Sequence, residues 1–385
     1  MIDFRLYDVV VVGCGLSGAV IAEHYARIVK KRVVILEKRD HIGGNCYDCV
    51  DENNILYNKY GPHFFHTNHE DVWEYIHRFS EWERYDHKVL GNIDGKTFPI
   101  PVNINTVNIL CGQNIRSEEE MCEWLSTNQV RYENITNSEE IAKSRVGDEL
   151  YNLIFKDYTF KQWGKYPNEL QPDVLARIPI RTNFDDRYFT DKYQVLPKYG
   201  YTEFFKTLLN HANITVHLNT DFFAIKDLIP STTTIVYTGP IDRYFADQGL
   251  EPLEYRSLNI VFESHKNTNF YQTNTQVNYP GLNEPFTRIT EYKHCLHQSS
   301  PHTTISKEYS TDQGEPYYPV LSDRNVKLFE KYQQLADAEM ARRNIHFLGR
   351  LANYKYFNMD AAIKNAIDYF HLHLVKSENP LPKTE

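Results

Sequence analysis

The stretch from Tyr7 to Glu37, YDVVVVGCGLSGAVIAEHYARIVKKRVVILE, decides the fold of this chain. Four valines lead into the glycine pattern GCGLSG, a helical pattern follows, and a second strand-like run ends on Glu37. Gly13 permits a tight turn, Gly15 lets the backbone approach a pyrophosphate, and Gly18 lets helix and strand pack closely. Glu37 comes 22 residues after Gly15, where it is placed to accept hydrogen bonds from a ribose. The stretch therefore predicts a dinucleotide-binding βαβ unit.

Two other interpretations of this segment are weaker. Residues 9–22 are apolar enough to resemble the centre of a signal peptide, but Asp3 and Asp8 precede them and a second strand pattern follows directly. The other alternative is a βαβ unit without a ligand, because glycine clusters can also serve packing alone. The complete strand–turn–helix–strand context favours the dinucleotide site.

The composition is that of a globular chain. Its 385 residues, 41% of them hydrophobic, are enough for two or three packed units. No apolar run reaches the ~18 residues that a membrane span needs, so we expect no span. The net charge of −9 argues against a nucleic-acid partner, and an anionic substrate would need a local cluster of cations. Six scattered cysteines make no disulfide framework, which predicts a cytoplasmic location.

Helical and strand patterns alternate in blocks along the rest of the chain. Residues 70–163 are mainly helical in pattern, and Ser117 and Asn137 begin two capping boxes there. From Tyr188 onward strand patterns return, at residues 214–218, 234–237, 258–262, 276–279 and 345–350. A last helix is expected over residues 361–374, with its N-terminus near the cofactor. This order predicts a helical unit inserted into an α/β unit.

Aromatic and cationic residues mix in an unusual way between residues 158 and 179. Tyr158 and Trp163 lie in the run YTFKQWG, and Arg177 follows in a segment rich in Pro, Asn and Asp. One interpretation is a base-stacking platform beside a mobile cationic lid. The other is a helix end packed on a domain boundary, with Arg177 in a surface ion pair. The residues alone do not decide between these two.

Two more arginines, Arg288 and Arg350, stand among apolar strand residues. An unpaired buried charge is costly, so each is either paired or directed at a ligand. Glu291 is one structural partner for Arg288. The alternative is that these two arginines and Arg177 together bind a diphosphate.

Other residues that could suggest a metal site or an acid/base pair have simpler explanations. His63, His66 and His69 lack a carboxylate at ligand spacing, and the CxxC motif of residues 46–49 lacks a second pair, so we expect no metal site. The adjacent Asp185 and Asp186 would point apart, which favours a turn over an acid/base pair. No serine or cysteine nucleophile motif occurs.

Ten segments together resemble the bacterial UDP-galactopyranose mutases, and the resemblance covers nearly the whole chain. The segments are GCGLSG (13–18), GGNCYD (43–48), YGPHFFHT (60–67), YTFKQWG (158–164), LARIPIRTNFDDRYF (175–189), YTGPIDRYF (237–245), EYRSLN (254–259), FTRITEYKH (286–294), EPYYPV (315–320) and GRLANYKYFNMD (349–360). Other FAD proteins of the amine-oxidase class share the first motif but not the lid or the last three.

The resemblance implies an isomerase that binds FAD and interconverts UDP-galactopyranose and UDP-galactofuranose without net redox change. Reduced flavin would attack the anomeric carbon through N5, and the resulting sugar adduct would reclose in the other ring form. An external reductant such as NAD(P)H or a reductase, a homodimer and a role in cell-wall polysaccharide biosynthesis are implied as well. The alternatives are an FAD-dependent oxidase or desaturase of the amine-oxidase class, and a non-catalytic flavoprotein that binds UDP-sugars.

The resemblance also implies roles for single residues. The catalytic set is Arg177 on the lid, its fixed partner Arg288, Arg350, His63 and His66. The substrate-binding set is Tyr158, Thr159, Trp163, Tyr188, Tyr318, Tyr356 and Asn358. The cofactor-binding set is Gly13, Gly15, Leu16, Ser17, Gly18, Glu37, Lys38, Gly44, Asn45, Gly61, His63, Gly349, Arg350 and Met359. Asn358 departs from the family, which commonly has an aspartate there, so an amide replaces a charge.

We therefore expect an α/β fold class with three units. A discontinuous Rossmann-like FAD-binding domain would comprise residues 1–85, 213–250 and 330–385. A helical domain with a mobile lid, residues 86–187, would be inserted into it. An antiparallel β-sheet domain would comprise residues 188–212 and 251–329, and the substrate would lie in the cleft among the three.

Overall fold

The computed structural model describes residues 2–375, in which the valine run and its partner strand form the centre of a parallel sheet. The sheet order is β10 (Ile214–His217), β2 (Val33–Leu36), β1 (Val9–Val12), β11 (Thr234–Tyr237) and β17 (Ile345–Phe347). All four pairings are parallel. Parallel strands buried on both faces read as continuous apolar runs, which is why VVVV and VVIL are strands here.

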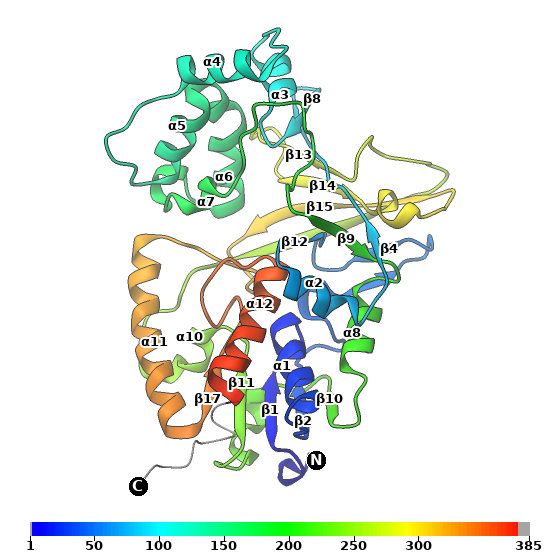
Figure 1. Ribbon diagram of the computed structural model, residues 1–385, viewed down its shortest axis with the longest axis vertical. Helices are drawn as coiled ribbons and strands as arrows, with labels where there is room; N and C mark the ends of the chain where they lie inside the picture. Colours follow the sequence, from blue (N-terminus) through cyan, green and yellow to red (C-terminus); the bar gives the residue numbers. More distant parts are fainter. Residues whose placement is uncertain (1, 376–385) are drawn as a thin grey trace.

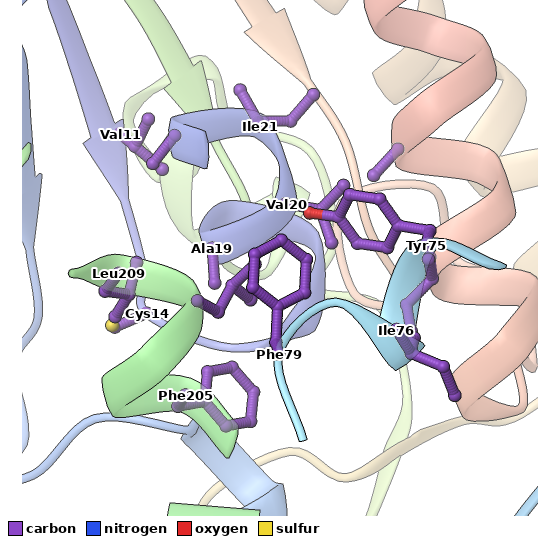
Figure 2. Close-up of a cluster of buried hydrophobic side chains, with 14 of the residues drawn as sticks. Val11, Cys14, Ala19, Val20, Ile21, Tyr75, Ile76, Phe79, Phe205 and Leu209 are labelled. Carbon is purple, nitrogen blue, oxygen red and sulfur yellow. The ribbon is translucent and has the colours of Figure 1, made fainter. Parts of the chain in front are cut away.

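Helices cover both faces of this sheet, which lies at the bottom of Figure 1. α1 (Leu16–Arg27) and α12 (Met359–Tyr369) pack together on one face, and a π-helical turn (Phe370–Leu374) extends α12. Figure 2 shows side chains from α2 (Glu70–His77) and α8 (Tyr201–Leu209) converging on α1 in this core. The core of the other face includes residues of α9 (Phe222–Ile225), α10 (Ile241–Tyr244) and α11 (Asp323–Arg343).

A seven-stranded sheet crosses the middle of the molecule (Figure 1). Its order is β16 (Tyr318–Pro319), β12 (Tyr255–His265), β15 (Thr303–Thr311), β14 (Arg288–Glu291), β13 (Gln276–Asn278), β7 (Val89–Ile93) and β8 (Lys96–Ile100). Every pairing is antiparallel except that of β13 with β7. The sheet therefore brings residues 89–100 beside strands that lie almost 200 positions later in the chain.

Helices α3 (Ile104–Leu110), α4 (Glu118–Asn128), α5 (Ser138–Leu150), α6 (Asp157–Trp163) and α7 (Asp173–Ala176) form the unit at the top of Figure 1. A π-helical segment (Tyr151–Lys156) joins α5 to α6. Ser117 and Asn137 cap α4 and α5 as the sequence predicts, each accepting from the amide three residues later. The glutamates at those third positions reach one residue further back than in a standard capping box, to Arg116 N and Thr136 N.

Two small sheets complete the fold, β3 (Asp48–Val50) with β4 (Leu56–Asn58), and β5 (Phe65–Thr67) with β9 (Tyr193–Pro197) and β6 (Trp82–Arg84). The expected α/β class with a Rossmann-like unit is confirmed. Residues 89–100, expected in the helical domain, form β7 and β8 of the large sheet, because β7 pairs with β13 on one side and with β8 on the other. Residues 201–209, expected in the sheet domain, form α8 against α1. The domain boundaries themselves stay a prediction, and the last of them extends beyond the described residues.

Candidate active site

The glycines of the first motif shape a cavity at the carboxyl end of β1. Gly13 takes a φ of +100°, and α1 begins just after it, with Gly15 as its N-cap residue. A Cβ on Gly18 would lie 2.0 Å from Gly13 O, so only glycine lets α1 pack against the turn at this point. A Cβ on Gly44 would lie 2.9 Å from Gly15 Cα, so two glycine backbones meet across the cavity mouth. Backbone this close to a helix N-terminus suits a pyrophosphate.

Glu37 directly follows β2, and its carboxylate is fixed beside the same cavity. Its Oε2 accepts from Cys14 N at 2.8 Å and its Oε1 from Arg39 N at 2.9 Å, and the residue is only 5% exposed. Each carboxylate oxygen keeps a second lone pair for a ribose hydroxyl. Lys38 lies next to it, with its Nζ 2.5 Å from Glu315 Oε2, and both side chains line the cavity.

Twelve of the fourteen predicted cofactor residues line this first cavity. They are Gly13, Gly15, Leu16, Ser17, Glu37, Lys38, Gly44, Asn45, His63, Gly349, Arg350 and Met359. Gly18 lies beneath the turn instead, where it serves helix–strand packing. Gly61 does not line the cavity but contacts His63, whose Nδ1 lies 2.8 Å from the carbonyl oxygen of Gly61.

A second cavity, of about 620 Å³, lies between the helical unit and the two sheets. All predicted catalytic and substrate-binding residues line it: His63, His66, Tyr158, Thr159, Trp163, Arg177, Tyr188, Arg288, Tyr318, Arg350, Tyr356 and Asn358. Four residues line both cavities, namely His63, Arg350, Asn358 and Met359. The two spaces therefore adjoin at these four side chains.

Asn358 lies at the start of α12, where the two cavities meet. It is the N-cap residue of that helix, yet its side chain makes no capping hydrogen bond. The amide is therefore available to a ligand, and the N-terminus of a second helix, after that of α1, faces the cavities.

Arginine and tyrosine side chains form one cluster in the second cavity. Tyr318 and Tyr356 stack with ring centroids 5.6 Å apart. The Arg177 guanidinium lies 4.4 Å above the Tyr356 ring, and Arg350 lies 5.4 Å from the Tyr318 ring. Burial acts to raise the pKa of Tyr356, but Arg177, Arg350 and Arg288 outweigh it, so the net pKa is below its usual value. A phenol with this shift indicates a strongly cationic environment, which suits a diphosphate.

Arg288 is paired, but not with the expected partner. Its Nε lies 3.3 Å from Oε2 of Glu308, which is 1% exposed on the neighbouring strand β15. Glu291 instead accepts from the amides of Tyr271 and Gln272. The expectation for Glu291 fails because strand residues three apart point to opposite faces of the sheet.

Two arginines that line the second cavity, and two cations on or beside α6, bind backbone carbonyls. Lys161 Nζ donates to Tyr279 O at 2.5 Å, Phe286 O at 2.9 Å and Glu284 O at 3.0 Å. Arg256 Nε donates to Gln162 O at 3.1 Å, Arg177 Nε to Val174 O at 3.1 Å, and Arg350 to Phe357 O. Within residues 2–375 none of these four cations forms an ion pair with a carboxylate.

The histidines of the cavity differ in their surroundings. Burial lowers the pKa of His63 to about 4, so its ring is neutral at neutral pH. His66 stacks on Phe189 with centroids 3.6 Å apart, and its Nδ1 lies 3.1 Å from Asp191 Oδ2. In the described part of the chain no group of three or more His, Cys, Asp or Glu side chains is arranged to hold a metal ion.

Sequence reasoning missed several residues of the cavity, among them His87, Asp191 and Asn278. His87 is 2% exposed, stacks on Phe64 at 3.7 Å, and its Nδ1 has no hydrogen-bond partner in the described structure. Burial lowers its pKa to about 3. No motif surrounds His87 or Asp191, and only the folded chain brings them to the cavity. Glu308 lies on β15 directly opposite Arg288 of β14, a pairing that only the register of the folded sheet reveals.

We expect His87→Phe to weaken the acid sensitivity of folding. Between pH 6.5 and about 3 the unfolded imidazole binds a proton that the folded one does not, so acidification favours unfolding. The variant loses this contribution, and its free energy of unfolding should fall by about 2 kcal/mol less than that of the wild type between pH 7 and 5. Urea titrations at the two pH values measure this difference. The exposed His69→Phe is the control, and equal losses in the wild type and His87→Phe would contradict the assignment.

Comparison with known proteins agrees with this geometry. Residues 153–356 match the family model of UDP-galactopyranose mutase, and residues 11–79 match that of the NAD(P)-binding Rossmann-like domain. The chain is 36% identical over 365 residues to a probable UDP-galactopyranose mutase of Klebsiella pneumoniae, covering 94% of this chain and 93% of the relative. It is also 36% identical over 379 residues to a dTDP-fucopyranose mutase of Escherichia coli, with 95% and 98% covered.

The fold has a solved counterpart as well. A crystal structure of reduced UDP-galactopyranose mutase superposes with a TM-score of 0.73 at 16% sequence identity, and 96% of each chain is covered. None of the helices in residues 2–375 has the length and apolar character to cross a membrane. The two cavities, the family match over more than half of the chain and the full-length relatives agree, and the chain therefore belongs to the UDP-galactopyranose mutase family of isomerases.

Proposed function

We propose that this protein interconverts UDP-galactopyranose and UDP-galactofuranose, with FAD in the first cavity and the nucleotide sugar in the second. One observation carries the proposal, the junction of the two cavities at His63, Arg350, Asn358 and Met359. A flavin extending from the glycine turn would present its ring system at this junction. The anomeric carbon of a sugar whose diphosphate binds the arginine cluster would face it.

The residues of the first cavity fit FAD. The close approach of Gly15 and Gly44 leaves room for a pyrophosphate at the N-terminus of α1, because any Cβ on Gly44 would fill that space. Glu37 suits the ribose of the adenosine half. When bound and reduced, FAD would supply the nucleophile that this chain lacks among its serine and cysteine motifs, and the reaction would leave no net redox change.

The residues of the second cavity would bind and orient the nucleotide sugar. Arg288, held by Glu308, would be the fixed diphosphate contact, and Arg177 on the segment after α7 would be the mobile one. Tyr158, Thr159 and Trp163 on α6 would line the base end. As the anomeric C–O bond breaks, negative charge grows on the diphosphate, and the arginines would stabilise it where it forms.

A dTDP-sugar is the second candidate substrate, because the dTDP-fucopyranose mutase of Escherichia coli is as similar in identity as the mutase of Klebsiella pneumoniae. Both relatives are named as mutases of pyranose nucleotide sugars. The two candidates differ in the base, in the 2′-hydroxyl of the nucleoside and in the sugar's 6-hydroxyl. They therefore need a direct comparison of substrates.

The assay uses dithionite-reduced protein under anaerobic conditions, with UDP-galactofuranose in one arm and dTDP-fucofuranose in the other. We expect UDP-galactopyranose to appear in the first arm only after reduction, and an oxidised sample is the control. Faster conversion in the second arm would replace UDP-galactose by the dTDP-sugar as the substrate. Consumption of oxygen with an oxidised sugar product would favour the oxidase alternative, and binding without conversion would favour the non-catalytic flavoprotein.

The remaining expectations rest on the family resemblance. An external reductant such as NAD(P)H or a reductase, a homodimer, a cytoplasmic location and a role in cell-wall polysaccharide biosynthesis stay predictions. The six cysteines, all free, support the cytoplasmic location.

A further inference from the structure

Arg145, a residue of α5, binds the backbone on both sides of the lid arginine. Its Nη1 donates to Ala176 O at 3.0 Å and to Ile178 O at 2.7 Å. These two carbonyls flank Arg177. Within residues 2–375 the guanidinium of Arg145 makes no ion pair with a carboxylate, and it binds the lid backbone through these two hydrogen bonds. Partial burial of the guanidinium lowers its pKa.

The end of α5 is built to hold Arg145 in this place. The helix loses its regular path at Gly147, which takes a φ of +80° and touches the carbonyl of Asn128 so closely that a Cβ would lie 2.4 Å from it. The break leaves carbonyl groups of α5 without their helical donors, and residues that follow α4 donate hydrogen bonds to them. Val130 N donates to Lys143 O, and Gln129 Nε2 donates to Arg145 O. The backbone of Arg145 is thereby fixed from the side opposite the lid.

The lid segment itself lies between two hydrophobic clusters. Leu175 packs into the core of the helical unit, together with Val146 and Leu150 of α5. Its neighbour Val174 packs with Trp163 and Val320, on the far side of the second cavity. The lid is therefore closed here, with Arg177 over Tyr356.

We infer that Arg145 is a positioning residue that latches residues 176–178 to α5 when the lid is closed, and so stabilises the closed position in which Arg177 lies over the diphosphate site. The inference rests on the proposed function in one respect, the diphosphate contact of Arg177. A contact that favours the closed lid lowers the cost of closing it on the ligand. Without the latch the closed lid is less stable, while the contacts of Arg177 with the bound diphosphate stay the same. Affinity should then fall, and turnover at saturating substrate should change little.

The test compares Arg145→Ala, Arg177→Ala and the double variant in the FAD-loaded, reduced protein. Binding of UDP and of dTDP is measured by isothermal titration calorimetry, and KM and kcat by the conversion assay. We expect Arg145→Ala to weaken nucleotide binding and raise KM by about tenfold, with kcat within about threefold of the wild type. In the Arg177→Ala background the same change should have no further effect, because the latch acts through Arg177.

Two further variants separate the latch from general damage to the helical unit. Arg131→Ala removes an exposed arginine from the loop between α4 and α5 and should leave binding unchanged. Arg145→Lys keeps one donor group for the two carbonyls and should restore part of the affinity, even if Arg145→Ala proves too unstable to measure.

The possible outcomes are distinct. Additive losses in the double variant, or equal losses of kcat and affinity in Arg145→Ala, would overturn the latch. Wild-type affinity in Arg145→Ala would overturn it as well. Unchanged binding of both nucleotides by Arg177→Ala would instead refute the diphosphate contact on which the proposed function depends. Non-additive losses with rescue by lysine would support the latch.

Discussion

Arg288→Lys is expected to lower kcat/KM for the nucleotide sugar by on the order of 10². The guanidinium of Arg288 forms an ion pair with Glu308 and also lines the second cavity, where its donors can reach a ligand. A lysine ammonium keeps the charge but not the planar pair of donors that a phosphate takes up. Steady-state kinetics of the reduced protein, with substrate varied through KM, measure the effect.

Replacement of Arg288 by lysine tests the phosphate contact more specifically than replacement by alanine. Removal of the whole cation would leave Glu308 buried and unpaired at 1% exposure, and such a charge typically costs about 3–5 kcal/mol of stability. Loss of activity would then report on folding. The control is Arg187→Lys, since Arg187 forms a more exposed pair with Asp185 that should contribute little. Activity of Arg288→Lys within threefold of the wild type would exclude the assigned role.

Gly44→Ala is expected to reduce the flavin content of the purified protein by more than tenfold. The new Cβ would lie 2.9 Å from Gly15 Cα, so the two backbones would have to separate where the pyrophosphate is proposed to bind. The φ of +57° adds strain for any residue with a side chain. The ratio of flavin absorbance to protein absorbance, followed by titration with added FAD, measures the loss.

Gly112→Ala provides the matched control. Gly112 has a similar φ of +63°, but a Cβ there meets nothing within 4 Å. Both variants therefore carry the backbone strain, and only Gly44→Ala adds the steric contact. If the two proteins retained equal amounts of FAD, the first cavity would not be the pyrophosphate site.

The sequence predicted those parts of the fold that depend on neighbouring residues. The turn at Gly13 and the caps at Ser117 and Asn137 follow from local geometry, and the structure has them in place. The strands at residues 89–100 were harder to predict, because they pair with each other and with β13, which is far away in the chain. A strand pattern becomes informative only when its partner is known.

The residues of the site also divide into those that a local motif marks and those that come together only on folding. Conspicuous motifs such as YTFKQWG and GRLANYKYFNMD marked residues that line the cavities. His87 and Arg145 carry no motif, and their contacts join segments that meet only after folding. For Arg288 the error was one of geometry, because Glu291 lies nearby along the strand but on the opposite face.

The carbonyl-bound cations have a consequence for how an anion reaches the cleft. A carbonyl oxygen carries only a partial charge, so Arg177 and Arg350 of the second cavity keep most of their positive charge, whereas a carboxylate partner would cancel it. The cleft is thus a region of positive potential on a chain with a net charge of −9. The net negative charge of the chain disfavours polyanions such as nucleic acids, while the arginines attract a small anion to the second cavity. The chain thereby draws a small doubly charged ligand to one place by diffusion, and added salt slows that capture.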